Sequence, residues 1–115
     1  MLTLAPFMQQ ILKEQSVDET TSAAVNCQGY PYLAVYVVGN GVTSSGVITV
    51  EESPTSDLAG TWASIGTINA SGGSGGAAAA LGLTVRAYGY VRARISTVIG
   101  GGGTVTVYLA GTPVG

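Results

Sequence analysis

Histidine is absent from this chain, and cysteine occurs only once, at position 27. Without histidine, the commonest general base and the commonest metal ligand of proteins are both missing. No Ser-His-Asp or Cys-His catalytic group can form, and a single cysteine cannot build a structural zinc site or an intrachain disulfide. We therefore expect a protein with no enzymatic activity, no cofactor and no metal centre.

Charged residues are also scarce. They make up 9% of the chain, against roughly 25% in typical soluble domains. Only four residues are basic, whereas nucleic-acid binding needs several Lys or Arg side chains on one face. Together with a net charge of −2, this argues against nucleic acid or an anionic membrane as a partner. Because interface cores are depleted of charge, the composition favours a protein that packs against other proteins.

Carboxylates are the remaining residues that could carry chemistry, at Glu51, Glu52 and Asp57. Glycosidases need two carboxylates that face one cleft, but adjacent residues of a strand such as Glu51 and Glu52 point to opposite faces. Glu52 and Asp57 could meet across a loop, and Glu51, Asp57 and loop carbonyls could hold calcium. The spaced Asp/Asn cluster of a strong calcium site is missing, so the favoured interpretation is a solvated loop rim.

Long hydrophobic runs are missing too. No stretch reaches 18 apolar residues, so the sequence predicts no transmembrane helix. The N-terminus lacks the basic segment and long apolar core of a signal peptide, and one unpaired cysteine suits a reducing cytoplasm. We expect Cys27 to be a small buried apolar residue. The Gly/Ser tract Asn69–Gly76 predicts a flexible surface loop, since no Lys-Ser or Lys-Thr follows it as in a phosphate-binding loop.

The strongest structural signal is the stretch from Tyr88 to Leu109. Apolar residues alternate with more polar ones in 88–99 and again in 104–109, which is the period of strands with one buried face. Gly100–Gly103 lies between them, so we predict a hairpin. A lone hairpin is marginal in water, and this one must therefore pack its apolar side on another sheet.

Further strands are predicted along the chain, separated by glycine-rich turns such as Gly39-Asn40-Gly41. About seven strands at intervals of 8 to 12 residues are typical of an antiparallel β-sandwich or jelly roll, which we assign to residues 19–115. The strands preceding the hairpin are expected at Glu19–Gln28, Tyr32–Val38, Gly46–Glu52, Thr61–Ile68 and Ala77–Arg86.

The first 18 residues differ in composition and are interpreted as an N-terminal arm. Phe7, Met8, Ile11 and Leu12 fall on one stripe of a short helix, for which Pro6 suits the first turn. So short a helix needs a docking partner. It could cap its own sandwich or grip a neighbouring subunit, and an extended arm along a neighbour is the alternative to a helix. These four apolar residues are candidate partner-binding residues.

Arg92 and Arg94 are the other candidates, because they face the same side of one predicted strand. They could be exposed charges that discourage edge pairing, or they could form salt bridges to an acidic partner surface. Exposed aromatic side chains are also candidates for stacking on sugar rings. Those considered are Tyr30, Tyr32, Tyr36, Trp62, Tyr88 and Tyr90.

Three short motifs resemble a pattern of tailed-phage structural proteins. They are Gly46-Val-Ile-Thr-Val-Glu-Glu-Ser, then Gly60-Thr-Trp62, then Tyr88-Gly-Tyr-Val-Arg-Ala-Arg-Ile, and the resemblance extends over Tyr30–Ala110. The chain is similar to the small jelly-roll cement or decoration proteins that stabilise phage capsids.

That resemblance implies a non-enzymatic protein on the capsid surface of a virion, assembled in the host cytoplasm. It implies the major capsid protein and further copies of the chain as partners, a homodimer being favoured and a homotrimer possible. Other virion parts, such as a neck, tail or head-fibre component, are the alternative, and a carbohydrate-binding β-sandwich is a further one.

Overall fold

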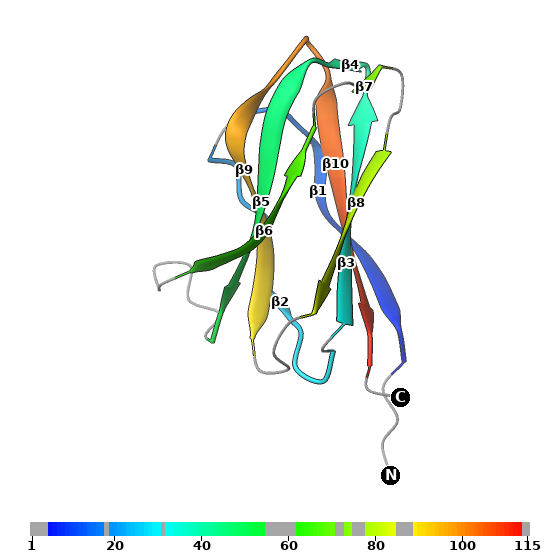
Figure 1. The fold of residues 1–115 in the computed structure, drawn as a ribbon, viewed down its shortest axis with the longest axis vertical. Helices are drawn as coiled ribbons and strands as arrows, with labels where there is room; N and C mark the ends of the chain where they lie inside the picture. The colour runs from blue at the N-terminus through cyan, green and yellow to red at the C-terminus, as the bar shows by residue number, and fades with distance from the viewer. Residues whose placement is uncertain are drawn as a thin grey trace.

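A computed structural model describes residues 5–17, 19–30, 32–54, 62–70, 73–74, 78–84 and 89–113. Two antiparallel four-stranded sheets pack face to face (Figure 1), which confirms the predicted β-sandwich. Sheet A has the strand order β1-β10-β3-β8, sheet B has β2-β9-β5-β6, and β4 pairs with β7 separately. The strands are β1 (Phe7–Gln15), β2 (Val25–Asn26), β3 (Tyr32–Asn40), β4 (Val42–Thr43), β5 (Ser45–Ser53), β6 (Ala63–Asn69), β7 (Gly73–Ser74), β8 (Ala78–Thr84), β9 (Tyr90–Gly100) and β10 (Thr104–Thr112).

The strand pairings are those of a jelly roll. β1 pairs with β10, β2 with β9, β3 with β8 and β5 with β6, as if one long hairpin were folded back on itself. The pairings of β10 with β3 and of β9 with β5 then roll this hairpin into two sheets. Eight strands connected in this way make the double-sheet architecture found in viral capsid and lectin domains.

The core lies between the inner faces of the two sheets, because alternate residues of the central strands are apolar. Sheet B contributes Ile48, Val50 and Ile95, and each of these side chains is fully buried. They pack with the buried apolar residues of sheet A in one cluster. The main contributors from sheet A are Leu33, Val35, Val37, Val105, Val107 and Leu109.

The predicted strands at 88–99 and 104–109 are present as β9 and β10, but the predicted hairpin between them is wrong. β9 belongs to sheet B and β10 to sheet A, so the glycine-rich turn connects the two sheets (Figure 1). Gly101 and Gly102 have φ angles of +97° and +87°, which only glycine adopts readily. Alternation of apolar and polar residues indicates that one face of a strand is buried, but it does not identify the neighbouring strand.

The helix predicted over Phe7–Leu12 is also wrong. Residues 7–15 form β1, which is hydrogen-bonded to β10 of the same chain at the edge of sheet A. The extended alternative is correct in conformation, but the strand lies on its own sandwich. A register shift between Gln10 and Leu12 interrupts the period of two, and this places Leu12 in the core.

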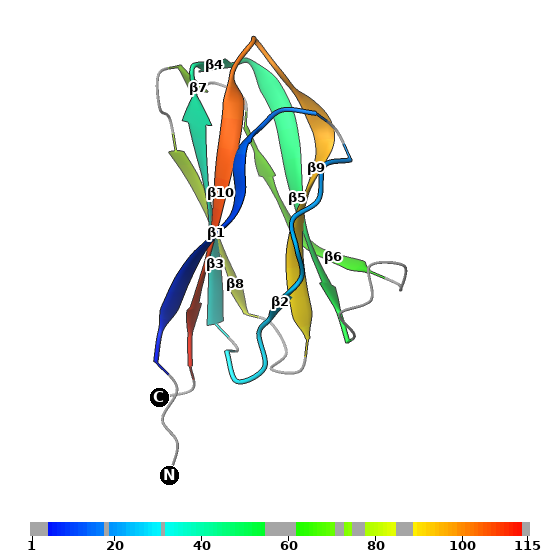
Figure 2. The same ribbon diagram turned by 180° about the vertical axis from the view of Figure 1, so that it is seen from behind.

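After β1 the chain crosses to the edge of sheet B (Figure 2). The amides of Glu19 and Ser22 donate to the carbonyls of Ile95 and Ala93, which ties the segment to β9. Of the strand predicted at 19–28, only Val25–Asn26 is regular, with an isolated bridge at Thr21. Within the Gly/Ser tract, Gly73–Ser74 forms β7 and pairs with β4, so this part of the predicted loop is a short strand.

Leu12→Ala should lower the free energy of unfolding by about 2–4 kcal/mol, because Leu12 is the β1 residue buried in the core. Urea denaturation provides the measurement, and Val98→Ala, at a side chain that is 52% exposed, is the control. A Leu12→Ala variant as stable as the control would mean that β1 is a detachable arm.

Candidate functional site

Three adjacent strands of sheet A, β10, β3 and β8, contain no charged residue. Because alternate residues of β3 and β10 fill the core, the remaining residues of these two strands lie on the outer face of the sheet. We call this outer surface the tyrosine face. It is formed by Tyr32, Ala34, Tyr36, Val38, Tyr108 and Ala110. Thr106, on the same side of β10, is buried and accepts a hydrogen bond from the Glu14 amide.

The register arranges these residues in rows across the sheet. Tyr36 lies directly opposite Tyr108, and the Gln10 amide donates to the Tyr108 hydroxyl at 3.4 Å. The next row contains only small residues on these two strands, Ala34 opposite Ala110. Tyr32 then begins the row beyond. Aromatic side chains therefore flank a row of small residues on a surface without charge.

The tyrosine face exposes two large aromatic side chains. The side chains of Tyr32 and Tyr36 are 56% and 38% exposed. Tyrosine is enriched in protein interfaces because a large apolar ring can be buried while the hydroxyl finds a hydrogen-bond partner. Contiguous exposed apolar patches mark interaction sites. The tyrosine face is therefore the candidate functional site.

The outer face of sheet B is different, because it carries a cluster of ion pairs. Arg92 Nε donates to Glu51 Oε1 at 2.9 Å, and Arg94 Nε donates to Glu51 Oε2 at 3.3 Å. Arg94 Nη1 also donates to Glu19 Oε1 at 2.9 Å. The Arg92 guanidinium lies 4.2 Å from the centroid of the Trp62 ring, which adds a cation–π contact.

This cluster corrects the sequence-based interpretation of the arginines. β9 is an interior strand of sheet B, so Arg92 and Arg94 do not protect an edge, and the Arg92 side chain is only 12% exposed. Both arginines are paired with Glu51 inside the chain. Binding of an acidic partner surface by them stays a prediction, and it would have to compete with these internal pairs.

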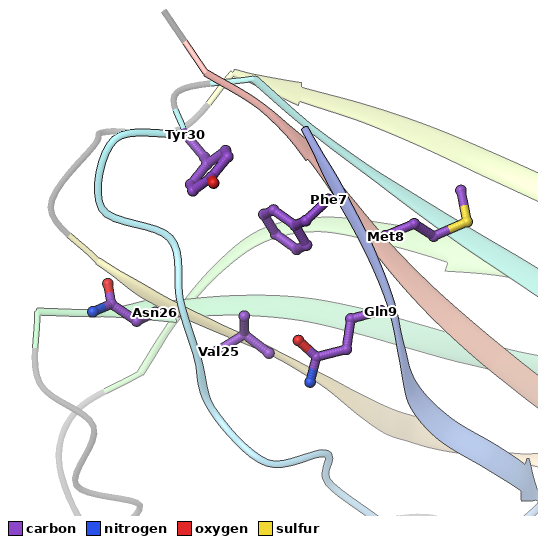
Figure 3. Close-up of a pocket in the computed structure, with 6 residues that line it drawn as sticks. All are labelled: Phe7, Met8, Gln9, Val25, Asn26 and Tyr30. Atoms are coloured by element: carbon purple, nitrogen blue, oxygen red, sulfur yellow. The ribbon is translucent and has the colours of Figure 1, made fainter. Parts of the chain in front are cut away.

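The four apolar residues of the predicted arm do not share one face. Leu12 is in the core, and Ile11 packs against it. Phe7 makes an edge-to-face contact with Tyr30, with ring centroids 4.8 Å apart, whereas Met8 is 65% exposed. Phe7 lines a pocket of about 360 Å³ where β1 approaches β2 (Figure 3). The lining residues are Phe7, Met8, Gln9, Val25, Asn26 and Tyr30.

Two other predictions concern the Cys27 thiol and the candidate carboxylates. Cys27 is buried, as predicted, and burial raises the pKa of its thiol to about 11. Glu51 is committed to the ion pairs described above, while Asp57 lies outside the described residues. Among the residues that the structure describes, no group of three acidic or cysteine side chains could hold a metal ion. The same part of the chain contains no helix long and apolar enough to cross a membrane.

Sequence reasoning considered Tyr32 and Tyr36 but missed Tyr108 and the absence of charge around them. A scan for uncharged strands could have found that signal, because residues 32–40, 78–84 and 104–112 all lack charge. Of the other aromatic candidates, Tyr30 packs against Phe7, Trp62 stacks on Arg92, and Tyr88 lies outside the described residues.

No protein-family model matches the chain, and no curated protein matches it.

Glu51→Gln should lower the free energy of unfolding by about 2 kcal/mol. Removing one partner of a buried ion pair leaves the other charge poorly solvated, and partial exposure of Arg94 reduces the cost. Glu52→Gln on the same strand is the matched control, expected within about 0.5 kcal/mol of the parent protein. Equal urea midpoints for the two variants would contradict a stabilising role for the cluster.

Cys27 makes stability fall at high pH. Its pKa rises from an ordinary 9.0 to about 11 in the folded protein. The unfolded chain therefore loses the thiol proton first, and the free energy of unfolding should drop by about 2 kcal/mol between about pH 8 and about pH 10.5. Comparison with Cys27→Ala by urea denaturation isolates this effect, since tyrosine ionisation is common to both proteins. Parallel pH profiles for the two would contradict it.

Proposed function

We propose that this chain is a non-enzymatic structural protein of a virion, which binds the outside of a phage capsid and bridges neighbouring capsid subunits. The motif resemblance to phage cement proteins supports this proposal, and so does the jelly-roll connectivity, which is frequent in viral capsid domains. A fold hosts many functions, so the proposal must depend on a specific surface.

The observation that carries the proposal is the tyrosine face. Burying an exposed tyrosine on this face requires no charge to be desolvated, and apolar burial contributes about 25 cal/mol for each Å². On the outer face of sheet B, by contrast, a partner would have to cover the partly exposed charge of Arg94 and the exposed charge of Glu19. Sheet A is therefore the side that fits a protein partner, and the major capsid protein is the partner that the resemblance implies.

The size of the face sets the strength of each contact. The two strands that form the face, β3 and β10, lie about 4.8 Å apart and are nine residues long, so together they span roughly 300 Å². This is well under half of the roughly 800 Å² that each partner of a standard interface buries. A single contact would be weak, but repeated attachment on a symmetric shell multiplies weak contacts through effective concentration. A cement protein uses its contacts in this way.

Two alternatives are retained. A neck, tail or head-fibre component would use the same face but would be present in few copies, which localisation on the particle by electron cryomicroscopy would distinguish. A carbohydrate-binding module is favoured by one observation, the exposed rings of Tyr32 and Tyr36 on one side of β3, roughly 13 Å apart along the strand. Saturable binding of a neutral oligosaccharide, without binding to capsids, would favour this module.

Co-sedimentation with undecorated capsids tests the proposal. The protein should bind saturably, and binding should change little between about 50 mM and about 500 mM salt, because the contact is uncharged. Tyr36→Lys should weaken binding at least tenfold (about 1.4 kcal/mol), since it places a charge in an apolar contact.

Val98→Lys adds the same charge at an exposed residue of β9 and is the matched control. Thermal melts of both variants establish that they fold. Absence of saturable binding at micromolar concentration, or equal binding by the two variants, would contradict the proposal.

A further inference from the structure

The free edge of β1 is unevenly protected against pairing with another strand. An edge strand exposes unpaired N–H and C=O groups, and natural proteins guard such edges with bulges and charges. In β1 the guards are confined to its second half, where the register shifts twice, Lys13 is charged and Glu14 has a φ of +50°. The first half, Phe7–Gln10, has continuous register with β10 and no charged residue.

The side chains of Phe7–Gln10 point alternately to the inner and the outer side of sheet A. Phe7 and Gln9 point to the inner side, toward Tyr30 and Val25 across the pocket (Figure 3). Met8 points away from that pocket centre, and Gln10 reaches Tyr108 on the tyrosine face. Met8 has the highest exposed fraction among the large hydrophobic residues that the structure describes.

A strand added here must therefore be uncharged and must offer an apolar residue opposite Met8. The same segment of a second copy meets both requirements. In an antiparallel pair, directly opposed residues point to the same face. A register with Met8 opposite Met8 of the second copy then sets Phe7 opposite Gln9, which keeps the inward-pointing side chains together.

We propose that two copies of this chain associate by antiparallel pairing of residues 7–9 about a twofold axis at Met8. The pairing joins two copies of sheet A into one continuous sheet of eight strands. It also places the two tyrosine faces on one side of that sheet, with the two β1 strands between them, so that a further partner meets two uncharged faces at once. The inference stands on the β1 edge alone and does not rest on the proposed function.

The dimer is weak because the contact is short. Three paired residues from each copy, Phe7–Gln9, bury well under the roughly 1,200 Å² at which stable interfaces begin. We expect a dissociation constant in the micromolar range, detectable by analytical ultracentrifugation from about 1 µM to about 1 mM protein. These measurements contain no capsid, so their outcome is independent of the co-sedimentation result.

Lysine substitution tests the position of the interface. Met8→Lys sets two like charges opposite each other and should weaken the dimer at least tenfold. Val98→Lys makes the same chemical change at a residue with similar exposure and should leave the dissociation constant unchanged. A monomer at all concentrations, or equal dimerisation by both variants, would overturn the proposal.

Cysteine substitution tests the register. Opposed residues of an antiparallel pair have Cα atoms about 4.5 or 5.5 Å apart, within the roughly 4.4–6.8 Å that a disulfide spans. Met8→Cys should thus form a covalent dimer under mild oxidation, and buried Cys27 would not compete. Val98→Cys is the control, and crosslinking of Met8→Cys no faster than this control would overturn the twofold at Met8.

Discussion

Apolar contact between the inner faces of the two sheets is the constraint on which the rest of the molecule depends. Ile48 and Ile95 from sheet B meet Val35 and Leu109 from sheet A in one buried cluster. A strand that gives every second residue to this core has the others left for the outer face. The two sides of the sandwich therefore differ in the chemistry of their outward residues.

On the outer face of sheet B, ion pairs fix the register between β5 and β9. Glu51 lies opposite Arg92 in the register of β5 and β9, and its carboxylate reaches Arg94 as well. A slip of one residue would turn Glu51 toward the core, where no cation faces it, so the ion pairs fix this register. Among the residues that the structure describes, the outer face of sheet A has no such pairs. Its register is fixed by the core on the other side and does not depend on ion pairs among the outward residues.

Much of the fold could be predicted from the sequence, because alternation is a local property. The strands containing Leu33, Ile48 and Ile95 were predicted nearly at their observed bounds. Strand neighbours could not be predicted, since the same alternation suits a hairpin and a connection between sheets. The spacing of Phe7 and Leu12 suggested a helix because a bulge interrupts the period of two and imitates a helical pattern.

The candidate site was less accessible to sequence reasoning. Exposed tyrosines were considered, but the pairing of Tyr36 with Tyr108 depends on register, which alternation does not provide. Arg92 and Arg94 attracted attention as charges, yet their partner Glu51 lies some 40 positions away, with separations of 41 and 43 residues. Contacts between residues so far apart in the sequence depend on which strands are neighbours, and this cannot be read from local alternation.

Oxidative footprinting of the protein, free and bound to particles, tests the central claim most directly. The account predicts that Tyr32 and Tyr36 lose reactivity on binding, while the exposed Val98 on sheet B keeps its reactivity. Unchanged reactivity of both tyrosines, together with protection of sheet B, would contradict it.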